Sequence, residues 1–113
     1  MTPWTLPWPP SVNHYYLHAR GRVIVGKRGV EYRKAVMEAP RPKKPLEGPI
    51  GVLIRCYPPD RRARDLDNLN KCLLDALQKA GYYHNDCQIK DLQLLMEERV
   101  KGGCVKVYLW NIQ

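Results

Sequence analysis

The sequence predicts an α+β (mixed α/β) fold in which one mixed β-sheet packs against about two helices. Three observations support this class: residues 50–57 alternate apolar side chains as a half-buried strand does, residues 65–80 repeat leucine at helical spacing, and residues 91–100 return to alternation. With 113 residues the chain can bury one hydrophobic core and is too short for a second. We therefore expect a single domain over residues 1–113.

The N-terminal third predicts an edge strand, an ordered loop, a second strand and a helix. The opening LPWPPSVNHYYLH is rich in proline, which lacks the backbone donor that a central strand needs, so only a short strand around residues 4–6 is expected. The β-branched run RVIVG follows. In KRGVEYRKAVMEA, helical spacing places Val30, Arg33 or Lys34, and Met37 on one face, and the helix ends at Pro40.

The loop APRPKKPLEGP, with four prolines and several charges, separates this helix from the second half of the chain. In the strand from Ile50 to Tyr57, the side chains of Val52, Ile54 and Cys56 are expected to share one buried face. The breaker PPDRRAR follows this strand.

The helix predicted from Asp65 to Ala80 stops at Gly81, and its apolar face carries Leu66, Leu69, Leu73, Leu74, Leu77 and Ala80. The segment YYHND is expected to be a turn before the alternating segment DLQLLMEERV. Residues 101–103, KGG, are then expected to form a hairpin into the last strand, CVKVYLWNI. The predicted order is β-β-α-β-α-β-β.

The charge of the chain points to a polyanionic partner. Nineteen Lys and Arg against eleven Asp and Glu give a formal net charge of +8, so nucleic acid is the expected partner. No membrane partner is expected, because the chain has neither a long basic amphipathic helix nor an apolar run near the ~20 residues of a span. The start MTPWTLPWPP lacks the apolar core of a secretory signal, and the four cysteines form no C-x-x-C pair, which favours reduced thiols in the cytoplasm.

The acidic residues are unevenly distributed. All six aspartates lie between residues 60 and 91, and all five glutamates lie outside that window. Aspartate holds its oxygens close to the backbone, so two or three on adjoining loop and helix ends can form an oxygen cage for Mg²⁺ or Mn²⁺. Without a cation, such carboxylates would repel one another.

Asp65 and Asp67 lie where the connection from the strand becomes the helix. One interpretation is that they cap the helix and meet the positive end of its dipole, an effect of about 0.5–2 kcal/mol. Lys71 stands four residues after Asp67 and, with Asp75, continues a polar stripe away from the leucine face. This stripe is either a solvated face with i,i+4 ion pairs or a metal-binding carboxylate beside a lysine that stabilises charge on a reacting phosphate.

Asp86, in YYHNDCQ, follows that helix. If the strand from Lys90 lies beside the strand that ends at Tyr57, Asp86 is expected at the same edge of the sheet as Asp65. The alternative is an ordinary Asn-Asp turn.

The run RRARDLDNLNK surrounds the two aspartates with positive charge. A phosphodiester is an anion that carboxylates alone would repel, so Arg61, Arg62 and Arg64 are expected to hold backbone phosphates while the aspartates hold the ion. The alternative is a solvated loop.

With these residues in place, the stretch PPDRRARDLDNLNKCLLDALQKAGYYHNDCQI resembles the RusA family of Holliday junction resolvases. The likeness extends to LPWPPSVNHYY, GVEYRKAV and VKGG, in the same order along most of the chain. Its specific part is D-L-D-N with a lysine four positions after the second aspartate and N-D fifteen residues beyond that lysine. The chain departs from the family in its middle, where the first long helix is shortened and APRPKKPLEGP follows early.

The resemblance implies a homodimeric, Mg²⁺-dependent endonuclease that resolves four-way DNA junctions by paired symmetric nicks during recombination and repair. It implies that Asp65, Asp67 and Asp86 are the essential metal-binding aspartates and that Lys71 is the essential lysine, with Mn²⁺ expected to substitute for Mg²⁺. Phages and prophages of bacteria commonly carry such proteins, so a bacterial cytoplasm is the expected setting.

In the N-terminal loop, Asn13, His14, Tyr15 and Tyr16 are candidates for DNA contact, the aromatic rings stacking on bases exposed at the branch point. The alternative is that the tyrosines cover the core. Two rival functions also stay open: a DNA-binding protein without catalysis, and a nuclease for other branched or flap DNA.

Overall fold

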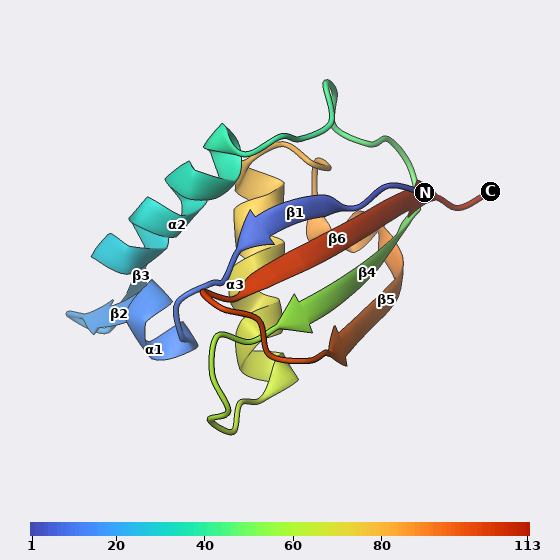
Figure 1. Cartoon of the computed structure of the whole chain (residues 1–113). Helices are drawn as coiled ribbons and strands as arrows, with labels where there is room; N and C mark the ends of the chain where they lie inside the picture. The colour runs from blue at the N-terminus through green and yellow to red at the C-terminus, as the bar shows by residue number, and fades with distance from the viewer.

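Strand β4 (Ile50–Tyr57) is the centre of a four-stranded sheet with the order β1-β6-β4-β5 in the computed structural model, which describes all residues 1–113 (Figure 1). Strand β6 (Cys104–Asn111) pairs with it antiparallel on one side, and β5 (Ile89–Met96) pairs parallel on the other. Strand β1 (Trp4–Pro7) is the antiparallel edge beyond β6. The structure confirms the predicted mixed sheet and α+β class.

Helix α3 (Leu66–Lys79) forms the core together with β4. The side chains of Val52, Ile54 and Cys56 are fully buried, and α3 buries Leu69, Leu73 and Leu77. Burial of such an aliphatic side chain contributes about 1.5–3 kcal/mol. Both the strand and the helix face match their predicted periodicity. None of the helices combines the length and apolar composition needed to span a membrane.

Helix α2 (Lys27–Glu38) has the predicted extent but not the predicted face. Its buried residues are Gly29, Tyr32 and Val36, whereas Val30 and Met37 are about half exposed. Only glycine fits at position 29, because a Cβ there would lie 2.4 Å from the backbone oxygen of Tyr15. The inward face of α2 thus combines a close backbone approach at Gly29 with the burial of Tyr32 and Val36.

The N-terminal loop contains two elements that the sequence did not predict. A short helix α1 (Val12–Tyr15) leads into β2 (Tyr16–Ala19), which pairs antiparallel with β3 (Arg22–Val25) in a separate two-stranded sheet. Arg20 and Gly21 at its turn both have left-handed φ values, 50° and 74°, as a tight two-residue hairpin turn requires.

The hairpin predicted between the last two strands is wrong. Strands β5 and β6 lie on opposite sides of β4, and the segment between them crosses the end of β4. Its backbone is held there by hydrogen bonds from Glu97 N to Cys56 O (2.8 Å) and from Val100 N to Pro58 O (3.0 Å). Because β5 runs parallel to β4, it ends at the same end of the sheet where the antiparallel β6 begins, so a short connection can span one strand.

A single carboxylate joins the three helices. The Tyr15 hydroxyl of α1 donates to Asp75 Oδ2 of α3, and Arg33 of α2 approaches the same oxygen through Nη2 at 2.7 Å and Nε at 2.8 Å. Tyr15 is fully buried, and this burial, together with the hydrogen bond to Asp75, raises its pKa well above the usual value.

We predict that Tyr15→Phe lowers the free energy of unfolding by about 1.5–3 kcal/mol, because it removes a hydrogen bond to a charged group. Urea denaturation measures the change. The matched control is Tyr57→Phe, since the Tyr57 hydroxyl makes no hydrogen bond within the chain. Equal losses in the two variants would contradict the role of the Tyr15 hydroxyl.

Candidate active site

Two exposed aspartates stand at the N-terminus of α3. Asp65 is the N-cap residue, with φ −91° and ψ 132°, yet its side chain makes no capping hydrogen bond. Asp67 lies in the first helical turn. Neither carboxylate forms an ion pair with any residue of the chain. The Asp65 side chain thus does not serve as a hydrogen-bonding cap, and both carboxylates are open to a ligand from solvent.

Asp60, five residues before Asp65, organises the arginine-rich loop. Its carboxylate accepts from the backbone N of Arg62 (2.9 Å) and pairs with Arg62 Nη2 (3.1 Å) and Arg64 Nη1 (2.8 Å). The hydrogen bonds from Arg64 and Arg62 hold the pKa of Asp60 well below its usual range. Asp60 therefore stays ionised and sets the shape of the loop that leads to Asp65.

The three predicted phosphate-binding arginines occupy different environments. The Arg62 side chain is 81% exposed and that of Arg64 only 16%, with the Arg64 guanidinium 5.4 Å from the ring centroid of Trp8. Arg61 is exposed and forms no ion pair. Arg61 is free to reach a phosphate from solvent, and Arg62 is largely exposed although it pairs with Asp60, whereas Arg64 is largely held by Asp60 and Trp8.

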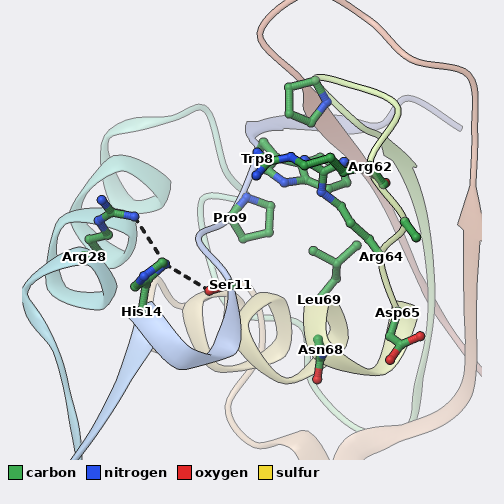
Figure 2. Close-up of a pocket in the computed structure, with 12 residues that line it drawn as sticks. Trp8, Pro9, Ser11, His14, Arg28, Arg62, Arg64, Asp65, Asn68 and Leu69 are labelled. Carbon is green, nitrogen blue, oxygen red and sulfur yellow. Dashed lines mark hydrogen bonds between the residues drawn. The ribbon is translucent and has the colours of Figure 1, made fainter.

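A groove of about 770 Å³ lies between this loop and the N-terminal segment, with Asp65 in its wall (Figure 2). Its opposite wall carries His14, whose Nδ1 lies 3.0 Å from Ser11 Oγ and 3.3 Å from Arg28 Nη1. The groove is lined by Trp8, Pro9, Ser11, His14, Arg28, Pro59, Arg62, Ala63, Arg64, Asp65, Asn68 and Leu69. Three arginines against one aspartate make it suited to an anionic strand.

Lys71 lies one helical turn after Asp67, but its side chain contacts Tyr16 and not the aspartates. It forms no ion pair with Asp67 or Asp75; its Nζ lies over the ring of Tyr16, 4.8 Å from the centroid. Burial raises the pKa of Tyr16 to about 12, so the ring remains a neutral platform for the ammonium group. Asp75 is instead occupied by Arg33 and Tyr15.

Of the DNA-contact residues predicted in the N-terminal loop, some are exposed in the structure and one is buried. Tyr15 is fully buried among the helices and cannot stack on a base, so that expectation is wrong. The Tyr15 ring points inward because α1, which ends at Tyr15, packs on α2 and α3. Asn13 is exposed and, with Tyr16 and Lys71, lines a smaller hollow of about 210 Å³.

The predicted location of Asp86 is also wrong. Asp86 opens a 3₁₀ turn, η1 (Asp86–Gln88), directly before β5, and the first residue of β5, Ile89, pairs with Ile50 at the start of β4. A parallel strand begins beside the beginning of its neighbour, so Asp86 lies at the opposite end of β4 from Asp65.

Asp86 is nevertheless held in a defined position. Its Oδ1 accepts from the Tyr83 hydroxyl at 2.7 Å, and its backbone N donates to Gln78 Oε1 at 3.0 Å. The Tyr83 hydroxyl also lies 2.9 Å from Leu74 O, which ties the turn to the second half of α3. Burial raises the pKa of Tyr83 well above its usual value, so this hydroxyl keeps its proton.

The carboxylates fit a divalent cation only in part. Mg²⁺ is commonly held by one or two carboxylates, with water and substrate phosphate oxygens completing its shell, and Asp65 with Asp67 matches that donor set. The chain nowhere brings together three His, Cys, Asp or Glu side chains that could hold a metal ion. Asp65, Asp67 and Asp86 are thus not gathered into such a group in this structure.

Two contributors to the site were not identified from the sequence. The role of Asp60 could have been predicted, because aspartate side chains in turns often accept a hydrogen bond from the backbone N–H two residues later, as Asp60 does from Arg62. Tyr83 was not, because its hydroxyl meets Asp86 and Leu74 only through the packing of the turn on α3.

Comparison with known proteins shows a consistent set of relatives. The family model described as "Endodeoxyribonuclease RusA" matches residues 7–109. The chain is 45% identical over 102 residues to "Crossover junction endodeoxyribonuclease RusA" of Escherichia coli (strain K12), which covers 88% of this chain and 85% of the relative. The protein of the same description from Enterobacteria phage 82 is 44% identical over the same shares. That of Escherichia coli O139:H28 is 43% identical over 111 residues, or 96% of this chain and 92% of the relative.

We predict that Asp65→Asn and Asp67→Asn each change the free energy of unfolding by no more than about 1 kcal/mol, the size of a helix-dipole effect. Urea denaturation measures this. Asp75→Asn is the internal comparison and is expected to cost about 1.5–3 kcal/mol, because Asp75 accepts charged hydrogen bonds. A loss above 2 kcal/mol at Asp65 or Asp67 would show that the fold depends on these carboxylates.

Proposed function

The chain belongs to the RusA family of endodeoxyribonucleases, and from that membership we propose that it is a crossover junction endodeoxyribonuclease that resolves four-way DNA junctions by paired symmetric nicks. The observation that carries the proposal is the pair of exposed aspartates, Asp65 and Asp67, without partners in the chain and beside a groove lined by arginine. Within the chain, two such carboxylates at a helix N-terminus contribute only through the helix dipole, whereas phosphodiester hydrolysis uses them as cation ligands.

Asp65 and Asp67 would hold a divalent cation, Mg²⁺, with Mn²⁺ as a substitute. The bound cation would supply an activated water, polarisation of the phosphate and neutralisation of the leaving 3′ oxygen. Arg61 and Arg62 would hold backbone phosphates that flank the reacting one. Arg64, through Asp60 and Trp8, would keep the loop in the shape that carries Asp65.

Lys71 would stabilise the charge that develops on the phosphate. Its Nζ is held over an aromatic ring, so the ammonium group would act there as a positioned positive charge. Tyr16 would act as a positioning residue for the ammonium group, since its ring face is the contact that orients Nζ.

We further propose that the enzyme is a homodimer and that each site takes its third carboxylate from the second copy. Asp65 and Asp86 lie at opposite ends of β4 in one chain, and no three-ligand cluster exists within it. A two-fold axis perpendicular to β4 would exchange the two ends, so it can bring Asp86 of the partner subunit to Asp65 and Asp67. Two sites related in this way would match the two-fold symmetry of a four-way junction.

The biological setting follows from the relatives. Proteins of this description occur in Escherichia coli strains and in Enterobacteria phage 82. We propose that the chain acts on recombination and repair intermediates in a bacterial cytoplasm, encoded by a phage or prophage.

The proposed activity predicts cleavage of a four-way junction. Wild-type protein is expected to cut a labelled immobile four-way junction in Mg²⁺ at symmetric positions on two strands, and Asp67→Asn to lose at least ~100-fold in cleavage rate while still binding the junction, because a cation ligand is removed. Mapping both cuts at nucleotide resolution tests this. Binding without cutting in either Mg²⁺ or Mn²⁺ would leave DNA binding as the function, and preferential cutting of flaps would indicate another branched substrate.

A site shared between two subunits predicts that two inactive variants complement each other. Asp65→Asn and Asp86→Asn proteins are each expected to be inactive, and mixing them after reversible dissociation is expected to restore nicking of one strand. In a mixed dimer with shared sites, one site keeps both aspartates and the other has lost both. If each site lay within one chain, both sites of the mixed dimer would be damaged and no activity would return. Refolded mixtures of each variant with itself serve as the control.

A further inference from the structure

The N-terminal part of the chain carries positive charge that nothing in the protein neutralises. The first acidic residue is Glu31, so residues 1–30 contain none. Four cations of this stretch, Arg20, Arg22, Lys27 and Arg28, are exposed, and none forms an ion pair. Elsewhere, Arg33, Arg55, Arg62 and Arg64 pair with carboxylates, whereas other cations such as Arg61 do not.

The β2–β3 hairpin presents two of these cations away from the body of the protein. It is a separate sheet without hydrogen bonds to the main sheet, and Figure 1 shows it at the outer side of α1 and α2. Its base is fixed: Gly26 N donates to Tyr15 O at 2.8 Å, and the Leu17 side chain packs where a Cβ on Gly26 would lie. Its tip carries Arg20 and Arg22.

The hairpin also exposes apolar side chains that the core does not use. Leu17, Val23 and Ile24 are each about half exposed. A two-stranded hairpin is only marginally stable alone and gains little from leaving such side chains in water. Exposed arginines at the tip next to exposed aliphatic side chains suit a partner with an anionic backbone and apolar base faces.

The hairpin lies beside Lys71. One of its faces, through His18 and Val23, forms a wall of the 210 Å³ hollow that also contains Lys71 and Asn13. DNA held by the hairpin would therefore pass directly next to the lysine that follows Asp67 on α3.

We propose that the β2–β3 hairpin is a DNA-binding arm that holds one branch of the junction beside the reacting phosphate. Arg20 and Arg22 contact backbone phosphates, and Val23 and Ile24 contact bases that unstack at the branch point, as apolar side chains of DNA-bending proteins do. A two-stranded ribbon is narrow enough to enter a major groove. This inference rests on the proposed function, because it takes junction DNA as the ligand.

The test is the salt dependence of junction binding without divalent cation, between about 50 and 200 mM salt. Each phosphate contact contributes about −0.9 to the slope of log affinity against log salt, so the Arg20→Gln/Arg22→Gln variant should reduce the magnitude of the slope by about 2. The matched control, Lys43→Gln/Lys44→Gln, removes the same charge from the exposed 40–48 loop and should leave the slope near that of the wild type. An equal slope in both variants would overturn the inference, and thermal melts establish that both are folded.

A second variant separates DNA from a second copy of the chain as the occupant. Val23→Ser/Ile24→Ser should lose preference for junction over duplex while sedimenting as the wild type does. If it changes the oligomeric state instead, the exposed apolar side chains of the hairpin form an interface between copies and the inference is overturned. Wild-type protein that shows the arm-dependent slope but never cuts a junction would refute the proposed function and support the arm.

Discussion

The parallel pairing of β5 with β4 is the constraint on which the arrangement of this protein depends. It forces the turn that contains Asp86 to the start of β4, while the loop that contains Asp65 leaves from its end. It also sends the chain across the end of β4 to reach β6. The proposed shared site follows from this topology, because a second copy of the chain would supply the aspartate that one copy holds at the other end of β4.

The aspartates differ in whether cations of the chain pair with them. Asp75 is surrounded by Arg33 and Tyr15 and joins three helices, and Asp60 is surrounded by Arg62 and Arg64 and shapes a loop. Asp65 and Asp67 have no such partners. The same residue type thus serves the fold where cations of the chain surround it and remains available to a ligand where they do not.

The exposed cations also differ in whether carboxylates of the chain pair with them. Arginines near the aspartates are partly tied up by Asp60, which positions them on the wall of a groove. The four cations at the N-terminus form no ion pair, although Glu31 lies one helical turn from Lys27 and Arg28 on α2. In the proposed complex, DNA would contact both the basic groove and the unpaired cations of the hairpin, which lies close to Lys71.

Local periodicity in the sequence determined much of this protein. The buried face of β4, the leucine face of α3, the mixed-sheet class and the aspartate pair at the helix N-terminus were all predicted, because each depends on residues within one or two turns or on one strand. Only the tertiary structure decided the rest: the inward face of α2, the burial of Tyr15, the place of Asp86 and the crossing between β5 and β6. These depend on which distant backbones meet, at Gly29 against Tyr15 or Ile50 against Ile89, and residue spacing along the chain carries no information about such encounters.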